Sequence, residues 1–246
     1  MKIYVFDTTE ELARAVARRI AAQLRKDPRT VLGLATGGTP LATYGELRRM
    51  HAAGLVDFSQ ATTFNLDEFA GIAASHPGSF RRYMDVKLFD SVNLDPHRIH
   101  FLNGVAADLD AECARYEEAI EIRGGIDLQL LGIGANGHIG FNEPDDALAA
   151  RTHRVRLHDQ TRRDNSALFA GDAAQVPREA LSMGMGTILK SRAIVLIAIG
   201  ARKARCVELT VTGPITTRLP ASFLQLHRDV ELYLDRGAAA RLALPS

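Results

Sequence analysis

The chain has no tryptophan among its 246 residues, and its only two cysteines are Cys113 and Cys206. No CxxC spacing occurs, so the residues of a disulfide framework or of a cysteine zinc site are missing. Two unpaired cysteines are compatible with a reducing cytoplasm.

An excess of charge and a long apolar run are equally missing. Lys and Arg number 30 against 29 Asp and Glu, which gives a net charge of +1 and no overall field to attract nucleic acid or an anionic membrane. No uncharged stretch approaches membrane-spanning length, and Asp7, Glu10 and Glu11 fall where a signal peptide needs its apolar core. We therefore expect a cytoplasmic protein without nucleic-acid or membrane partners, whose small anionic substrate is held by local groups.

Short apolar runs alternate with amphipathic stretches along almost the whole chain. Such runs predict strands at residues 3–6, 31–35, 62–66, 126–133, 193–199 and 230–234. The run 193–199 is the most apolar and predicts a central strand, whereas 230–234 predicts an edge strand. Strands separated by helices indicate a doubly wound, mainly parallel sheet with helices on both faces. No linker or repeat interrupts the pattern, so we expect one α/β domain over residues 1–246.

A glycine-rich turn follows the strand predicted at 31–35. The segment Thr36-Gly37-Gly38-Thr39-Pro40 allows Thr39 to cap a helix with Pro40 in its first turn. Free backbone amides at a helix N-terminus bind phosphate well, although a tight turn without a ligand has the same sequence. The segment lacks the Gly-Lys-Ser/Thr that would complete a nucleotide-binding P-loop.

Acidic residues end the strand predicted at 62–66. Asp67 and Glu68 follow an apolar run directly, where an unpaired buried carboxylate would be costly. Asp67 is a candidate general base, although a helix cap or a loop carboxylate is the simpler explanation from composition alone.

A third segment, Gly132 to Pro144, contains G-x-G-x-x-G after a strand but no helix opening at the third glycine. Dinucleotide binding is therefore disfavoured. Instead the loop places His138 between Asn136 and Glu143, an arrangement that can fix the histidine tautomer for acid–base chemistry.

Lys203 lies in the first turn after the strand predicted at 193–199. A lysine there opposes the helix dipole, so contact with a phosphate explains it better than helix stability does. A solvent-exposed charge is the alternative. In a parallel sheet the candidate motifs all fall at the carboxyl ends of strands, where ligands bind.

The segments TGGTP, FNLDEF, GIGANGHIGFNEP, ALSMGMGTIL, GARKA and SFLQLH, in this order, resemble the glucosamine-6-phosphate deaminase family. The resemblance runs from about Lys2 to Leu234 and implies a Rossmann-like domain without a nucleotide. It implies deamination and isomerisation of glucosamine 6-phosphate to fructose 6-phosphate in amino-sugar catabolism, with no metal or organic cofactor required.

By position, the resemblance also implies the roles of individual residues. Asp67 matches the base that moves a proton between C2 and C1, and His138 matches the group that opens the sugar ring, oriented by Asn136 and Glu143. The implied substrate- and phosphate-binding residues are Thr36, Gly37, Gly38, Thr39, Gly134 and Lys203.

The sequence departs from the family in three places. Some members carry Asp at the position of Asn136, an arginine usually occupies the position of Ala167, and a tyrosine that of Phe80. Ala167 and Phe80 leave open which amino-sugar phosphate is preferred. If residues 161–169 form one helix, Arg163 and Ala167 share a face, and Arg163 could supply the missing cation.

Residues that bind an activator in regulated members also differ, since Asp146, His153 and Val155 stand there. We therefore expect no such activation. The alternatives to the deaminase are an enzyme for galactosamine 6-phosphate, a 6-phosphogluconolactonase-type hydrolase and a non-catalytic sugar-phosphate sensor. The oligomeric state stays open between monomer and homo-oligomer.

Overall fold

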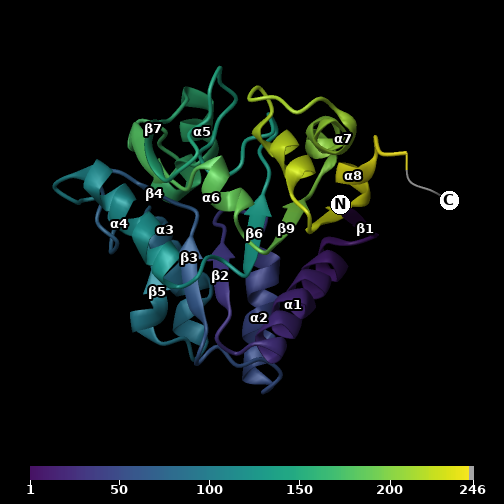
Figure 1. Ribbon diagram of the computed structural model, residues 1–246, viewed down its shortest axis with the longest axis horizontal. Coiled ribbons are helices and arrows are strands. Elements are labelled where there is room, and N and C mark those ends of the chain that lie inside the picture. Colours follow the sequence, from purple (N-terminus) through teal and green to yellow (C-terminus); the bar gives the residue numbers. More distant parts are fainter. Residues whose placement is uncertain (244–246) are drawn as a thin grey trace.

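A seven-stranded parallel sheet forms the centre of the molecule in the computed structural model, which describes residues 1–243 (Figure 1). Its strand order is β1-β10-β9-β6-β2-β3-β5. The strands are β1 (Lys2–Phe6), β2 (Val31–Leu34), β3 (Thr62–Asn65), β5 (Ile99–His100), β6 (Leu128–Gly132), β9 (Ala193–Ala198) and β10 (Val230–Asp235). The predicted doubly wound, mainly parallel sheet is confirmed.

Side chains of successive residues in β9 enter two different hydrophobic cores. Ile194 and Leu196 belong to one core, while Val195 and Ile197 belong to the other, as the alternation of a strand requires. Both faces are apolar because helices cover both. This explains why residues 193–199 form the most apolar run of the chain.

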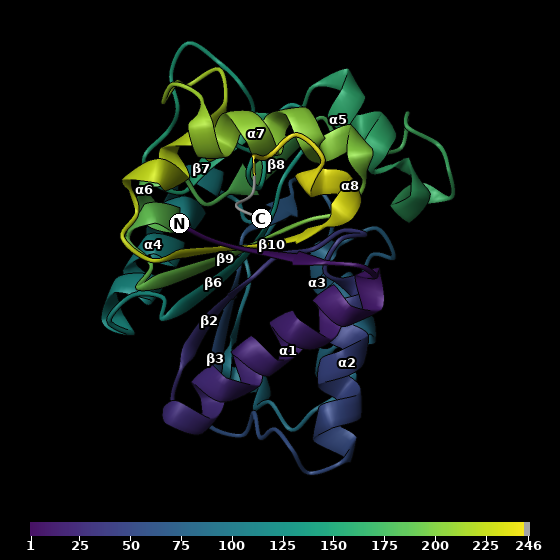
Figure 2. The same cartoon turned by 90° about the vertical axis from the view of Figure 1, so that its right-hand side faces the viewer.

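Helices lie on both sides of the sheet (Figure 2). Helices α1 (Thr9–Lys26), α2 (Leu41–Ala52) and α3 (Phe80–Lys87) contribute to the core on one face. The other face carries α4 (Leu109–Ile122), α6 (Met185–Leu189), α7 (Ala204–Thr212) and α8 (Arg236–Ala239). Thr8 caps α1 in a capping box with Glu11, whose side chain accepts from the Thr8 amide.

A second, antiparallel sheet was not predicted from the sequence. It has the order β4-β8-β7 and consists of β4 (Asp67–Phe69), β8 (Glu179–Ser182) and β7 (His153–Arg156). Only Leu66 separates β3 from β4, so the chain passes from the first sheet to the second beside Asp67. These strands are four residues or shorter, which is too short for a periodic pattern to show.

Two predictions from the sequence are wrong, one about the place of a strand in the sheet and one about a helix cap. The strand β10 is not an edge strand, because it pairs with β1 on one side and β9 on the other. Thr39 does not cap α2, which begins at Leu41 with Pro40 in the capping position and no capping side chain. The proline still marks the start of the helix, because its fixed φ suits a helix N-terminus.

Candidate functional site

A cleft of about 640 Å³ lies at the carboxyl ends of β2, β3, β6 and β9. This is the edge at which parallel sheets bind ligands. The residues around it include most of the predicted site: Thr36, Gly37, Gly38, Thr39, Asp67, Gly134, His138 and Lys203. Phe80, Thr161, Asp164, Asn165 and Arg202 line it as well.

The glycine-rich turn forms one wall of the cleft between β2 and α2. Gly37 has φ +95°, a conformation that favours glycine, and its carbonyl accepts a hydrogen bond of 2.6 Å from the Tyr83 hydroxyl. Within residues 1–243 the backbone amides of Gly37, Gly38 and Thr39 have no protein acceptor. They lie just before the N-terminus of α2, so the wall can bind an anion.

Lys203 reaches the cleft from a turn of 3-10 helix, Ala201–Lys203, that precedes α7. The turn begins at Gly200, whose φ is +91° and whose amide donates to both carboxylate oxygens of Asp235 at 3.0 Å. Burial lowers the pKa of Lys203, and neighbouring Arg202 lowers it further, while Asp164 acts in the opposite direction. A bound anion would offset the cost of holding this ammonium group away from water.

Asp67 is buried at the start of β4, and no hydrogen bond reaches its Oδ1 among the described residues. Burial, together with the charge of Glu68, raises the pKa of Asp67 to about 8. A carboxyl group with this pKa can take and return a proton near neutral pH, which is what a general acid–base catalyst does.

Glu68, in contrast, is fully bonded. Its carboxylate accepts four hydrogen bonds of 2.7–3.0 Å, from the Ser79 hydroxyl and from the amides of Phe69, Phe80 and Arg81. Burial raises the pKa of Glu68, and these bonds oppose the rise. The neighbouring acids therefore differ in role: Glu68 anchors the start of α3, and Asp67 is left without a partner.

His138 lies beside a network around Glu143, as the sequence predicted. Its Nδ1 is 3.4 Å from Glu143 Oε2, which also accepts a hydrogen bond of 2.8 Å from Asn136 Nδ2. Thr161 donates its hydroxyl to the other oxygen, Oε1. Burial opposes ionisation, but His138, Thr161 and Asn136 together lower the pKa of Glu143 to about 2. Among the described residues Nδ1 has no hydrogen-bond partner in this geometry. A carboxylate only accepts, so a proton on Nδ1 would face Oε2 and leave Nε2 for the substrate.

The spacing of glycines in this loop follows from the position of the His138 ring. A Cβ at residue 134 would lie 2.3 Å from the ring, so only glycine allows the approach. Gly137 has φ +85°, and a Cβ there would lie 2.1 Å from the side chain of Leu219. The G-x-G-x-x-G spacing thus serves the histidine loop, and no helix follows that could hold a dinucleotide.

Arg163 does not occupy the cleft. Helix α5 (Asp159–Asp164) ends before Ala167, which belongs to a separate turn of 3-10 helix, Ser166–Phe169. The premise that Arg163 and Ala167 share one continuous helix face is therefore wrong. Both residues are exposed, and the Arg163 guanidinium donates to Gln160 Oε1 at 2.9 Å.

Thr161 and Asp164 line the cleft but were not singled out from the sequence, and Arg202 was given no role there although it lies in the GARKA segment. Thr161 belongs to no segment with distinctive spacing, and its significance comes from its hydrogen bond to Glu143. For Arg202, its position directly before Lys203 was the one available signal.

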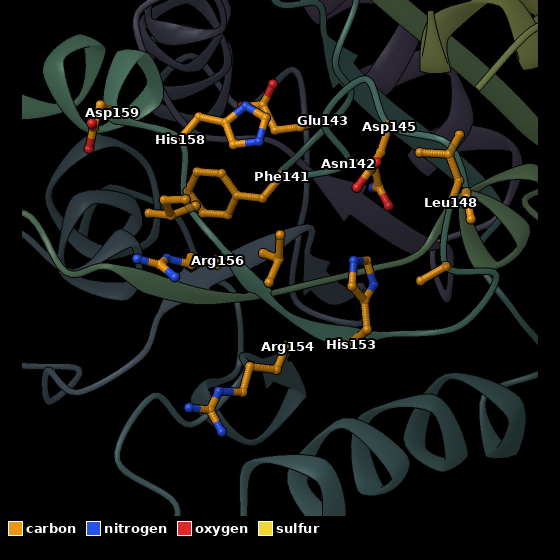
Figure 3. A pocket seen from close by; sticks show the side chains of 14 residues that line it. Phe141, Asn142, Glu143, Asp145, Leu148, His153, Arg154, Arg156, His158 and Asp159 are labelled. Carbon is orange, nitrogen blue, oxygen red and sulfur yellow. The ribbon is translucent and has the colours of Figure 1, made fainter. Parts of the chain in front are cut away.

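A second cavity of about 690 Å³ lies against the other side of the Glu143 segment (Figure 3). His153 and Arg154 both line it, and their side chains extend to opposite sides of β7, as alternation in a strand requires. Val155 also lines the cavity, whereas Asp146 pairs with Arg218 on the surface. The replacements noted in the sequence therefore lie in or beside this cavity.

No group of three or more His, Cys, Asp or Glu side chains is placed to hold a metal ion within residues 1–243. Over the same residues, no helix is long and apolar enough to cross a membrane.

Proteins of known name match this chain over nearly all of its length. A glucosamine-6-phosphate deaminase of Halothermothrix orenii is 47% identical over 242 residues, covering 98% of this chain and 100% of that protein. Another, from Thermoanaerobacter sp. (strain X514), is 45% identical over 98% of this chain and 94% of its own length.

Solved structures show the same fold. A monomeric glucosamine-6-phosphate deaminase superposes with a TM-score of 0.95 at 45% identity, covering 98% of this chain and 100% of that one. A 6-phosphogluconolactonase from Trypanosoma brucei, at 20% identity, has a TM-score of 0.75 with 98% of both chains covered, which shows shared fold alone. Residues 6–233 match the family described as glucosamine-6-phosphate isomerases/6-phosphogluconolactonase, and the chain belongs to this family.

Proposed function

We propose that this chain is a glucosamine-6-phosphate deaminase, which converts glucosamine 6-phosphate and water to fructose 6-phosphate and ammonia. One observation carries the proposal: a buried carboxyl group without a partner, Asp67, shares a cleft with an anion-binding wall and with His138, whose Nδ1 is 3.4 Å from Glu143. Relatives 45–47% identical over nearly the whole chain bear this enzyme's name, which supports the same conclusion.

The phosphate group is held between the glycine-rich turn and the turn of Lys203. The amides of residues 37–39 supply oriented donors, and Lys203 supplies a positive charge from the opposite wall. A phosphate monoester carries nearly two negative charges at neutral pH, so one lysine does not neutralise it. Arg202 is the second cation on this wall, and we assign to it the phosphate-binding role that the sequence suggested for Arg163, which does not line the cleft.

His138 opens the sugar ring. With its Nδ1 proton directed to Glu143, the imidazole presents Nε2 to the substrate. There it accepts the proton of the anomeric hydroxyl and returns one to the ring oxygen, which breaks the C1–O5 bond and leaves an open-chain aldehyde. Gly134 contributes because the absence of a side chain leaves room for the imidazole ring of His138.

Asp67 then moves a proton between carbons. As a carboxylate it removes the C2 proton to give an enolamine, and as the acid it returns that proton to C1, which produces an imine at C2. Water adds to the imine, and ammonia leaves to give the ketone. Each step needs Asp67 in one protonation state and then the other, and a pKa of about 8 allows both near neutral pH.

A lactonase is the alternative within this family. It requires a histidine base and an anion site but no carbon acid chemistry, so it offers no reason for a buried Asp67 without a partner. The lactonases among the solved structures are 16–20% identical and share the fold alone. A galactosamine 6-phosphate enzyme would use the same cleft, with Phe80 lining it. We also propose that residues 1–246 act as one catalytic domain in the cytoplasm.

Purified protein incubated separately with glucosamine 6-phosphate, galactosamine 6-phosphate and 6-phosphogluconolactone tests the proposal. We expect ammonia and fructose 6-phosphate in equal amounts from the first compound, and slower turnover of the second. Lactone hydrolysis without ammonia release from either amino sugar would overturn the proposal. Faster turnover of galactosamine 6-phosphate would instead reassign the substrate.

A further inference from the structure

Thr161 connects the wall of the cleft to the catalytic histidine. It lies in the middle of α5, with only 5% of its surface exposed, and its hydroxyl donates to Glu143 Oε1. Glu143 Oε2 faces His138 Nδ1 at 3.4 Å. One carboxylate group therefore joins the two side chains, which are 23 residues apart in the sequence.

Thr161 is also hydrogen-bonded to the C-terminal end of α5, which lines the cleft. The Thr161 carbonyl accepts hydrogen bonds from the backbone amide of Asn165 at 3.1 Å and from its Nδ2 at 2.9 Å. Asn165 lines the cleft, as does Asp164. Hydrogen bonds thus run from the cleft wall through Thr161 to Glu143, whose other oxygen lies 3.4 Å from His138 Nδ1.

The hydrogen bond from Thr161 to Glu143 Oε1 determines that Oε2 is the oxygen facing His138. With Oε1 held by Thr161 and Oε2 held by Asn136, the Glu143 carboxyl group cannot rotate about its terminal bond without losing both donors. The loss of a hydrogen bond to a buried charge is expensive, so the group stays in one orientation. This orientation places an acceptor toward Nδ1 and selects the tautomer with Nε2 free.

We propose that Thr161 is a positioning residue, which orients Glu143 and thereby sets the tautomer of His138. This inference rests on the proposed ring-opening role of His138. It makes α5 part of the catalytic arrangement, although α5 contributes no group that reacts with the substrate.

Three variants of the full-length chain test the inference. Thr161→Val keeps the shape of the side chain and removes the donor, and Thr161→Ser keeps the donor. Thr187→Val is the matched control, because Thr187 makes a similar buried bond of 2.6 Å to Glu117 Oε1 on α4, away from the cleft. The readouts are the ¹⁵N shifts of the His138 ring, steady-state kinetics with glucosamine 6-phosphate, and Tm.

In Thr161→Val we expect the ring to change from the Nδ1-protonated tautomer to a mixture. We expect kcat to fall about tenfold or more, as for a lost bond to a charged group, with KM changed less than about twofold. Thr161→Ser should restore the tautomer and most of kcat. Thr187→Val should lower Tm and leave the His138 ring unchanged.

A Thr161→Val protein with a lower Tm but the wild-type ring shifts would show a merely structural role and overturn the inference. The ring shifts are measured without turnover. Failure here is therefore distinguishable from failure of the proposed function, which would show as no ammonia from the wild-type protein.

Discussion

Asp67 differs from the other buried acids of this chain because its Oδ1 has no hydrogen-bond partner among the described residues. Glu68, Glu117 and Glu143 all accept several hydrogen bonds. An unpaired buried carboxyl group reduces stability, so its presence in a ligand cleft indicates that it serves the reaction. The sequence placed Asp67 correctly at the end of a strand, but only its burial distinguishes it from a loop carboxylate.

The first prediction at this scale concerns proton transfer by Asp67. Asp67→Asn keeps the shape of the side chain and removes the basic oxygen, so proton exchange at C2 should fall by about 10²–10⁴-fold. Sugar-phosphate binding should remain, since the phosphate contacts lie elsewhere in the cleft. Deuterium incorporation from solvent measures the exchange, and exchange at the wild-type rate would contradict the assignment.

The second prediction separates two arginines. Arg202→Ala should raise KM for glucosamine 6-phosphate about tenfold, as expected for a lost charge-assisted bond to the phosphate. Arg163→Ala is the matched control: its guanidinium bonds to Gln160 outside the cleft, so KM should not change. The opposite pattern, with Arg163→Ala alone raising KM, would return Arg163 to the phosphate site.

At the scale of elements, the site depends on short segments that leave regular strands. The chain turns from β3 into β4 within one residue, which places Asp67 at the meeting point of two sheets. The pairing of β4 with β8 fixes this turn, with Asp67 opposite Ser182. The strand at 62–66 was predictable from its apolar residues, whereas this pairing joins residues more than 100 positions apart and leaves no local pattern.

The third prediction concerns the His138 loop. Gly134→Ala would place a methyl group 2.3 Å from the His138 ring, so the ring must shift from its present position beside Glu143. We expect kcat to fall at least about tenfold because the displaced ring loses the geometry that proton transfer needs. The 1–3 kcal/mol cost of overpacking should leave the protein folded. Gly45→Ala in α2 is the control, because its Cβ would meet nothing within 4 Å. Unchanged kcat in Gly134→Ala would show that the ring position is not critical.

At the scale of the whole molecule, the pKa of Asp67 makes stability depend on pH. Because that pKa is raised to about 8, the folded protein retains a proton that the unfolded chain has already lost above about pH 4. The free energy of unfolding therefore decreases as the pH rises through this window, at up to about 1.4 kcal/mol per pH unit from this group.

The fourth prediction follows from this sign. From pH 5 to pH 8 the free energy of unfolding of the wild type should fall relative to that of Asp67→Asn, because asparagine does not ionise. The difference, Asp67→Asn minus wild type, should therefore increase with pH. Urea denaturation of both proteins at pH 5, 6, 7 and 8 measures the difference. Parallel curves would mean that Asp67 is ionised throughout and not raised in pKa.

The fifth prediction concerns regulation. The cavity beside Glu143 presents His153 and Val155, and Asp146 nearby is paired with Arg218, so the basic residues of regulated relatives are replaced. We expect hyperbolic kinetics that N-acetylglucosamine 6-phosphate does not change. A sigmoidal curve that becomes hyperbolic with this compound would contradict the expectation.

The sequence by itself determined the parallel sheet, its helices and the positions of Asp67, His138, Glu143 and Lys203, because these follow from local periodicity and from motifs. The tertiary structure decided the features that depend on pairing and packing between distant segments of the chain. It placed β10 inside the sheet, formed the second sheet, and ended α5 so that Arg163 lies outside the cleft. It also joined Thr161 to Glu143 through a single hydroxyl. Such contacts depend on how distant segments pack, and no spacing along the chain records them.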